Sequence, residues 1–112
     1  MQYVLLIYDD EKRWAAKGYD EAELKEYGVF GQEFDKQIKG GKALQPTRAA
    51  TTVRVREGKR LSTDGPFAET KEHLSGFYLV EAKDKDEALR IAAKIPAAKY
   101  GSIEVRPIMK FD

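Results

Sequence analysis

Two short segments of this chain are apolar at every position, and they constrain the fold more than any other feature. Residues 3–8 read Tyr-Val-Leu-Leu-Ile-Tyr, and residues 77–80 read Phe-Tyr-Leu-Val. A strand with one wet face alternates apolar and polar residues, so continuous apolar runs predict central strands covered on both faces. Since 112 residues leave room for one hydrophobic core, the sequence predicts a single domain over residues 1–112.

Each of these strands is followed by a helix-start signal. Acidic residues spaced as in a capping box stand after both strands: Asp20 with Glu23, and Asp84 with Glu87. The first helix is predicted to end at Gly40-Gly41 and the second at Pro96. A strand followed by a capped helix in each half indicates a split βαβ arrangement. The predicted fold is therefore α+β and ferredoxin-like, an antiparallel sheet with two main helices on one face.

Two glycines inside the first predicted helix, Gly28 and Gly31, need a physical reason. Each costs up to about 1 kcal/mol relative to alanine in a helix interior. We interpret them as positions where the helix closely approaches the sheet or a partner.

Further short strands are predicted outside the two central ones. Residues 43–45 form one, and residues 51–56 alternate before Glu57-Gly58 turns the chain into a return strand over residues 60–63. Arg54 and Arg56 share one face of this inserted β-hairpin, which is either a solvated charged face or an anion-binding pair. Residues 103–107 alternate and predict a last strand exposed on one side.

Two helices can cover only one face of a four-stranded sheet, yet both central strands are apolar on both faces. A wet second face would expose a larger apolar patch than monomers normally tolerate. We therefore predict a homodimer that packs through the open sheet face.

The densest polar cluster lies just before the second central strand. Residues 64–76 read D-G-P-F-A-E-T-K-E-H-L-S-G and hold the chain's single histidine. Asp64 is either a turn residue whose carboxylate accepts a backbone hydrogen bond, or a catalytic group. His73 is either an exposed loop residue or a base that moves protons at neutral pH. We predict Asp64 and His73 as the candidate catalytic residues.

The same loop is predicted to face a cleft between the sheets of the dimer, where partial burial would shift pKa values. Its aromatic walls and hydroxyl donors would come from the central strands. The candidate ligand-binding residues are Tyr8, Arg54, Pro66, Phe67, Glu69, Lys71 and Tyr78. The alternative for residues 69–72 is one solvated helical turn.

Composition excludes several classes of function. The net charge is +1 and the basic residues are scattered, which argues against nucleic acid as a partner. No apolar segment is long enough to span a membrane, and the lack of cysteine fits a cytoplasmic protein. No nucleotide-binding motif is present, and a lone histidine offers no metal-binding partner, so neither cofactor nor metal is expected.

The motif at Asp64-Gly65-Pro66-Phe67 resembles the signature of the DGPF branch of the YCII-related family. Segments similar to that family recur in order along the chain, at residues 3–8, 27–30, 41–46 and 100–107. The resemblance implies a ferredoxin-like domain that pairs into a dimeric α/β barrel. Relatives in the wider family carry a proposed acid/base pair that includes a histidine on the first long helix. This chain has no histidine between Tyr19 and Gly41, so that pair is not carried over.

Two functions from different classes remain open at this stage. The first is a small-molecule-binding domain with lyase-like or hydrolase-like acid/base catalysis beside the Asp64 loop. The alternative is a non-catalytic regulatory or sensory dimer that interacts with another protein. The shape of the cleft and the direction of Asp64 and His73 distinguish them.

Overall fold

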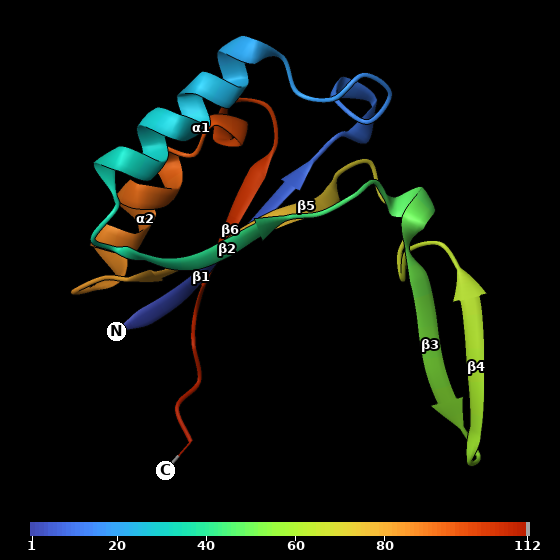
Figure 1. The fold of residues 1–112 in the computed structure, drawn as a ribbon. Coiled ribbons are helices and arrows are strands. Elements are labelled where there is room, and N and C mark those ends of the chain that lie inside the picture. The colour runs from blue at the N-terminus through green and yellow to red at the C-terminus, as the bar shows by residue number, and fades with distance from the viewer. Residues whose placement is uncertain (112) are drawn as a thin grey trace.

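The computed structural model describes residues 1–111, which form a four-stranded antiparallel sheet with two helices on one face (Figure 1). The sheet order is β2-β5-β1-β6. The elements of this body are β1 (Gln2–Asp9), α1 (Glu21–Glu33), β2 (Ile38–Ala43), β5 (His73–Glu81), α2 (Lys85–Ala93) and β6 (Ser102–Pro107). This topology confirms the predicted α+β ferredoxin-like fold. Within the described residues, no helix is long and apolar enough to cross a membrane.

The face of the sheet under α1 and α2 holds the hydrophobic core. Leu5 on β1 pairs with Tyr78 on β5 and with Val105 on β6, so these three side chains share this covered face. Leu5 and Val80 are fully buried. The other buried members of the core are Tyr3, Ile7, Phe30, Phe34, Ala82, Ala88, Ile91, Ala92, Ile95 and Ala97.

The opposite face of the sheet, called here the open face, is not covered by helices. It is apolar on the two central strands, and β6 adds the ion pair of Glu104 and Arg106 beside Leu6 and Val4. Val4 pairs with Leu79 and Leu6 pairs with Phe77, which places all four side chains on this face. Each of them is only half-buried. The two central strands are thus apolar on both faces, as their sequence predicted.

The first helix ends earlier than its sequence predicted. α1 stops at Glu33, and Gly40 and Gly41 lie inside β2, so the strand predicted at residues 43–45 instead spans Ile38–Ala43. Position 41 needs a glycine because the neighbouring strand β5 leaves no room for a side chain, and not because a helix ends there. A Cβ at this position would meet the carbonyl oxygen of Phe77 at 2.6 Å.

The predicted helix caps form, with one change of partner. The Asp20 carboxylate accepts from the Glu23 N–H at 2.7 Å, and the Asp84 carboxylate accepts from the Glu87 N–H at 2.9 Å. The Glu23 side chain does not complete the first capping box, because it binds Arg13. Gly28 and Gly31 do not approach the sheet closely, since no atom outside the local helix backbone lies within 4 Å of a Cβ built at either position, and close approach to a partner stays a prediction.

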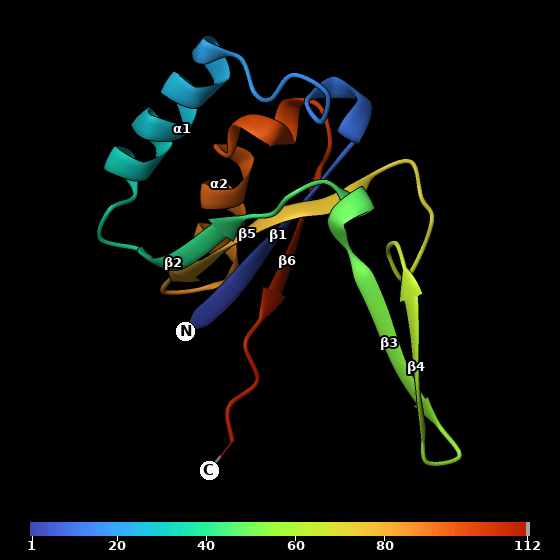
Figure 2. The ribbon, with the colours of Figure 1, turned by 45° about the vertical axis from the view of Figure 1, so that its right-hand side comes forward.

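The predicted hairpin forms a separate two-stranded sheet, called here the arm. It consists of β3 (Thr51–Arg56) and β4 (Lys59–Asp64), joined by a turn in which Glu57 and Gly58 have positive φ values of 52° and 75°. The arm and the chain after β6 both extend on the side of the sheet opposite to the helices (Figures 1 and 2). Short 3₁₀ turns at Glu11–Arg13, Thr47–Ala49 and Pro96–Lys99 connect these elements.

Candidate functional site

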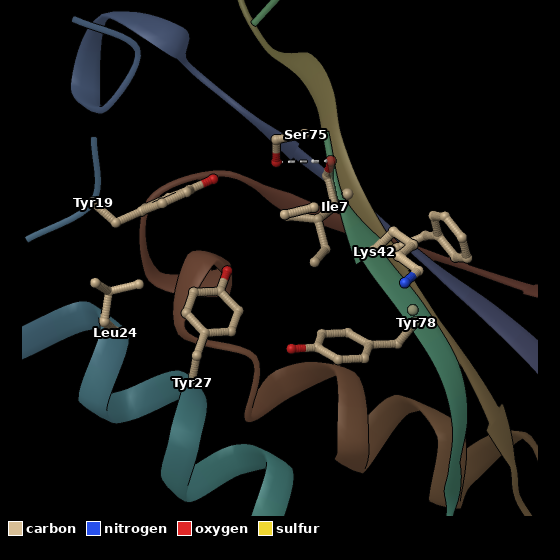
Figure 3. Close-up of a pocket in the computed structure, with 11 residues that line it drawn as sticks. Ile7, Tyr19, Leu24, Tyr27, Lys42, Ser75 and Tyr78 are labelled. Carbon is tan, nitrogen blue, oxygen red and sulfur yellow. Dashed lines mark hydrogen bonds between the residues drawn. The ribbon is translucent and has the colours of Figure 1, made fainter. Parts of the chain in front are cut away.

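A pocket of about 240 Å³ lies between α1 and the covered face of the sheet, called here the tyrosine pocket (Figure 3). Tyr19 reaches it from the segment before α1, Tyr27 from α1 and Tyr78 from β5, and the three hydroxyl groups point inward. Its remaining lining residues are Ile7, Leu24, Gly41, Lys42, Ala43, Ser75, Gly76 and Phe77. The pocket therefore combines aromatic walls with neutral polar groups, the usual make-up of a small-molecule site.

The tyrosine hydroxyls remain protonated over a wide pH range. Burial raises the pKa of Tyr27, and the nearby Tyr19 raises it further. Burial also raises the pKa of Tyr78 and of Tyr19, although in Tyr19 the contact with Ser75 opposes the shift. At neutral pH these groups are phenols that can donate hydrogen bonds to a ligand oxygen.

Ser75 reaches the pocket because β5 contains a bulge. The register between β1 and β5 shifts between Ile7 and Tyr8: Ile7 pairs with Gly76, Tyr8 pairs with Leu74, and Ser75 is the extra residue. Ser75 is buried, and its hydroxyl donates to the Ile7 carbonyl at 3.3 Å (Figure 3). The bulge thus adds a fourth hydroxyl group beside the three phenols.

A buried ion cluster holds the chain that leads into α1. Arg13 Nη1 lies 2.6 Å from Glu23 Oε1, and the same guanidinium also binds the carboxylate of Asp9, which is 0% exposed. Hydrogen bonds to Glu23 and then to Asp9 raise the pKa of Arg13, so it stays charged. The cluster connects the end of β1 to the first turn of α1.

The segment fixed by this cluster covers one end of the tyrosine pocket. Trp14 is buried and stacks on Tyr19 with ring centroids 5.0 Å apart and planes 9° apart. The rings of Tyr19 and Tyr27 meet edge to face, with their centroids 6.3 Å apart. We infer that the ion cluster positions Tyr19 over the pocket through this aromatic stack.

A second, larger and more open hollow of about 720 Å³ lies beside the predicted loop, called here the loop hollow. Its walls come from the end of β1, the segment 44–50 and the loop 66–74. Within the described chain, Nδ1 of His73 is buried without a hydrogen-bond partner. Glu72, also in the wall, accepts a hydrogen bond from the Ser102 hydroxyl at 2.8 Å.

The turn at Asp64 is built differently from the predicted one. The carboxylate of Asp64 makes no side-chain hydrogen bond in the described part of the chain, and the residue is exposed. The turn is instead closed by Gly65, whose N–H donates to the Ala50 carbonyl at 2.7 Å. Gly65 has a φ of 107°, a conformation that favours glycine.

The structure brings some of the predicted site residues together and separates others. Those that line the loop hollow are Tyr8, Pro66, Phe67 and His73. Arg54 stands beside them, with its guanidinium 5.5 Å from the Phe67 ring centroid. Asp64, Glu69 and Lys71 are exposed and line neither hollow. Tyr78 lies on the covered face, in the tyrosine pocket, whereas Tyr8 lies on the open face.

Sequence reasoning missed Tyr19, Tyr27 and Ser75 as site residues, and it missed the ion cluster. The sequence did hold one signal of the tyrosine pocket. Tyr27 falls on the apolar face of α1, and Tyr78 shares the covered face of the sheet with Leu5, so both tyrosines point into the space between helix and sheet. The position of Ser75 depends on the bulge, which strand alternation does not reveal.

The whole chain matches a known family, and one similar protein is also a close match in sequence. A family model of the YCII-related domain matches residues 1–112. An uncharacterized protein of Rhizobium meliloti (strain 1021) is 40% identical over 114 residues, which cover 96% of this chain and 92% of that protein.

A solved structure has the same fold. It is 5-chloro-2-hydroxyhydroquinone dehydrochlorinase from Burkholderia phenoliruptrix AC1100, in complex with 2,5-dihydroxybenzoquinone. The TM-score is 0.51 at 15% sequence identity, and the alignment covers 97% of this chain and 94% of that one. At this identity the likeness establishes the shared fold.

Proposed function

This chain belongs to the YCII-related domain family, and we propose that it binds a small oxygen-bearing ring compound in the tyrosine pocket. The convergence of the Tyr19, Tyr27 and Tyr78 hydroxyls on one hollow carries the proposal. Flat aromatic walls suit a planar ring, and phenols suit carbonyl or hydroxyl oxygens on its rim. The ligand of the structural neighbour, a dihydroxylated quinone, has this chemistry.

Binding, and not proton abstraction, is the role that the chemistry of this pocket supports. The raised pKa values of Tyr27 and Tyr78 keep both groups protonated at neutral pH, so they donate hydrogen bonds and do not act as bases. Each such bond to a neutral ligand oxygen contributes about 1 kcal/mol.

Calorimetric titration with hydroquinone and 2,5-dihydroxybenzoquinone tests the proposal. Tyr27→Phe and Tyr78→Phe should each weaken binding about five- to tenfold, because each removes one donor and leaves the ring in place. Tyr8→Phe is the matched control, since Tyr8 lies on the other face of the same sheet. Equal losses in all three variants, or no heat of binding for either compound, would contradict the proposal.

A second candidate site for acid/base chemistry is the loop hollow, which His73 lines and Asp64 does not. His73 supports it, because it lines the hollow and an imidazole can donate or accept a hydrogen bond. If a ring compound binds in the loop hollow through His73, the His73→Gln variant should lose that binding and keep the binding of ring compounds in the tyrosine pocket.

A non-catalytic interaction role predicts instead that neither hollow binds a ring compound. A cytoplasmic location stays a prediction.

We also propose that the chain works as a homodimer through its open face. One protomer exposes 8195 Å², whereas a folded monomer of 12.7 kDa exposes about 6,200 Å². The radius of gyration is 15.8 Å, against about 13 Å for a compact domain of this length. The excess of about 2,000 Å² is in the range that one protomer buries in an obligate homodimer. Sedimentation should therefore find a species of twice the monomer mass.

A further inference from the structure

The arm has few partners within its own chain. β3 and β4 form a ladder with each other and with no other strand in residues 1–111, and every residue of β4 is exposed. A two-stranded hairpin on its own is marginally stable in water. A partner from outside the protomer would supply the packing that the arm lacks.

The two faces of the arm differ in what covers them. One face turns to the chain's own loop: the Thr52 hydroxyl donates to the Gly65 carbonyl at 2.9 Å, and Arg54 lies over the Phe67 ring. The other, called here the valine face, carries Val53 and Val55, which are 56% and 62% exposed. Across the ladder Val53 pairs with Ser62 and Val55 pairs with Arg60, so this face presents two exposed valines between polar partners. Among the described residues of the same protomer, no other surface packs on these two valines.

Measured as a flat footprint, the open face is small for a stable interface. Four strands spaced about 4.8 Å apart, each with about six residues at about 3.3 Å per residue, give a flat footprint of about 400 Å². A stable interface buries about 800 Å² on each partner. The arm projects on the same side as the open face, so it is placed to supply the remaining area (Figures 1 and 2).

The loop hollow opens beside the same seam. Tyr8 and Leu74 pair across β1 and β5 on the open face, and both also line the hollow. Phe67, at the base of the arm, is 74% exposed in its wall. A body seated on the open face would therefore also cover the mouth of the hollow.

We propose that the arm packs through its valine face on a second copy of this chain, and that this second copy forms the missing wall of the loop hollow. The inference rests on the homodimer proposed above and deepens it. In a two-fold dimer each protomer gives and receives one arm, so the interface contains two arms and two open faces. The two hollows are then sites shared between protomers.

Excision of the arm separates this inference from the dimer proposal. Ala50 and Gly65 are hydrogen-bonded at 2.7 Å, so residues 51–64 can be replaced by two glycines without moving the body. Excision should raise the dimer dissociation constant at least about 100-fold in sedimentation experiments. An excised chain that dimerises as tightly as wild type overturns the arm's role and leaves the homodimer intact. A wild-type chain that stays monomeric at about 100 μM overturns both.

Two point variants give the same answer if the excised chain does not fold. Val55→Lys puts a charge on the valine face and should weaken dimerisation about tenfold. Val29→Lys is the matched control, because Val29 has the same 62% exposure but lies on α1, on the far side of the sheet. Equal dissociation constants for the two variants contradict the proposal.

A thiol placed in the wall reports on the hollow directly. Ala68 is exposed and lines the loop hollow, and the chain has no cysteine, so an Ala68→Cys variant carries one thiol. Labelling of that thiol by a maleimide should slow several-fold when protein concentration rises through the dimer dissociation constant. A labelling rate that does not change with concentration shows that the second copy leaves the hollow open, and overturns this part of the proposal.

Discussion

The two faces of the sheet contain similar residues but meet different surroundings. Along β1, Tyr3, Leu5 and Ile7 are buried by the helices, whereas Val4 and Leu6 alternate with them and stay half-buried. The covered face has every apolar partner it needs within one protomer. The open face has equivalent side chains without equivalent cover. Along the central strands the two faces therefore differ in cover and not in apolar content, and the proposed homodimer would supply the missing cover.

The largest expected effect concerns the ion cluster that belongs to the covered side. Arg13→Met leaves the carboxylates of Asp9 and Glu23 buried and unpaired, so the free energy of unfolding should fall by about 3 to 5 kcal/mol. Urea denaturation at pH 7 measures it. Arg90→Met is the control, because Arg90 is exposed and pairs with Glu87 at 3.6 Å on the surface of α2, and this variant should unfold near the wild-type midpoint. Similar losses for both variants would show that the buried cluster has no special role.

The next largest effect on stability compares Leu5 and Leu6, two adjacent residues of β1 that lie on opposite faces of the sheet. Leu5→Ala creates a cavity in the covered core and should cost about 3 kcal/mol at every protein concentration. Leu6→Ala should cost about 1 kcal/mol in dilute protein and more in concentrated protein, because in the proposed homodimer the second copy packs on Leu6. Denaturation at two concentrations checks this. A Leu6→Ala effect that is independent of concentration would remove the distinction between the two faces.

The smallest expected effect is a loss of folding stability at alkaline pH, and it arises from Tyr27 in the tyrosine pocket. Burial raises the folded-state pKa of Tyr27 above its unfolded value near 10, so the folded state holds its proton more tightly. Stability is therefore fully present below about pH 10 and falls as pH rises from there towards the folded pKa. Tyr27→Phe should reduce this fall, because it removes a group whose folded-state pKa is raised. Denaturation midpoints at pH 8 and above pH 10 make the measurement.

Most of the fold was predictable because it follows local rules. Apolar runs identified β1 and β5, the aspartate caps identified both helix starts, and the Glu57-Gly58 turn identified the hairpin. The end of α1 was wrong because Gly40 and Gly41 resemble a helix stop, while their actual role is close packing of Gly41 on Phe77. That role depends on a neighbour distant in sequence.

The candidate site was harder to predict because its parts come from separate segments. The loop 64–76 was identified as polar, and His73 and Phe67 do line a hollow there. The tyrosine pocket combines Tyr19, Tyr27 and Ser75 from three regions of the chain. The packing of α1 on the sheet and the bulge in β5 bring them together, so the sequence signal of the pocket is limited to Tyr27 on the apolar face of α1 and Tyr78 on the covered face of the sheet.

The bulge at Ser75 has an evolutionary consequence. Leu74 before it and Phe77 after it both lie on the open face, although three positions separate them. Loss of the one extra residue would restore a regular ladder and leave every other side chain on its present face. A single-codon insertion or deletion could thus switch the polarity of the cavity among descendants without disturbing the framework around it.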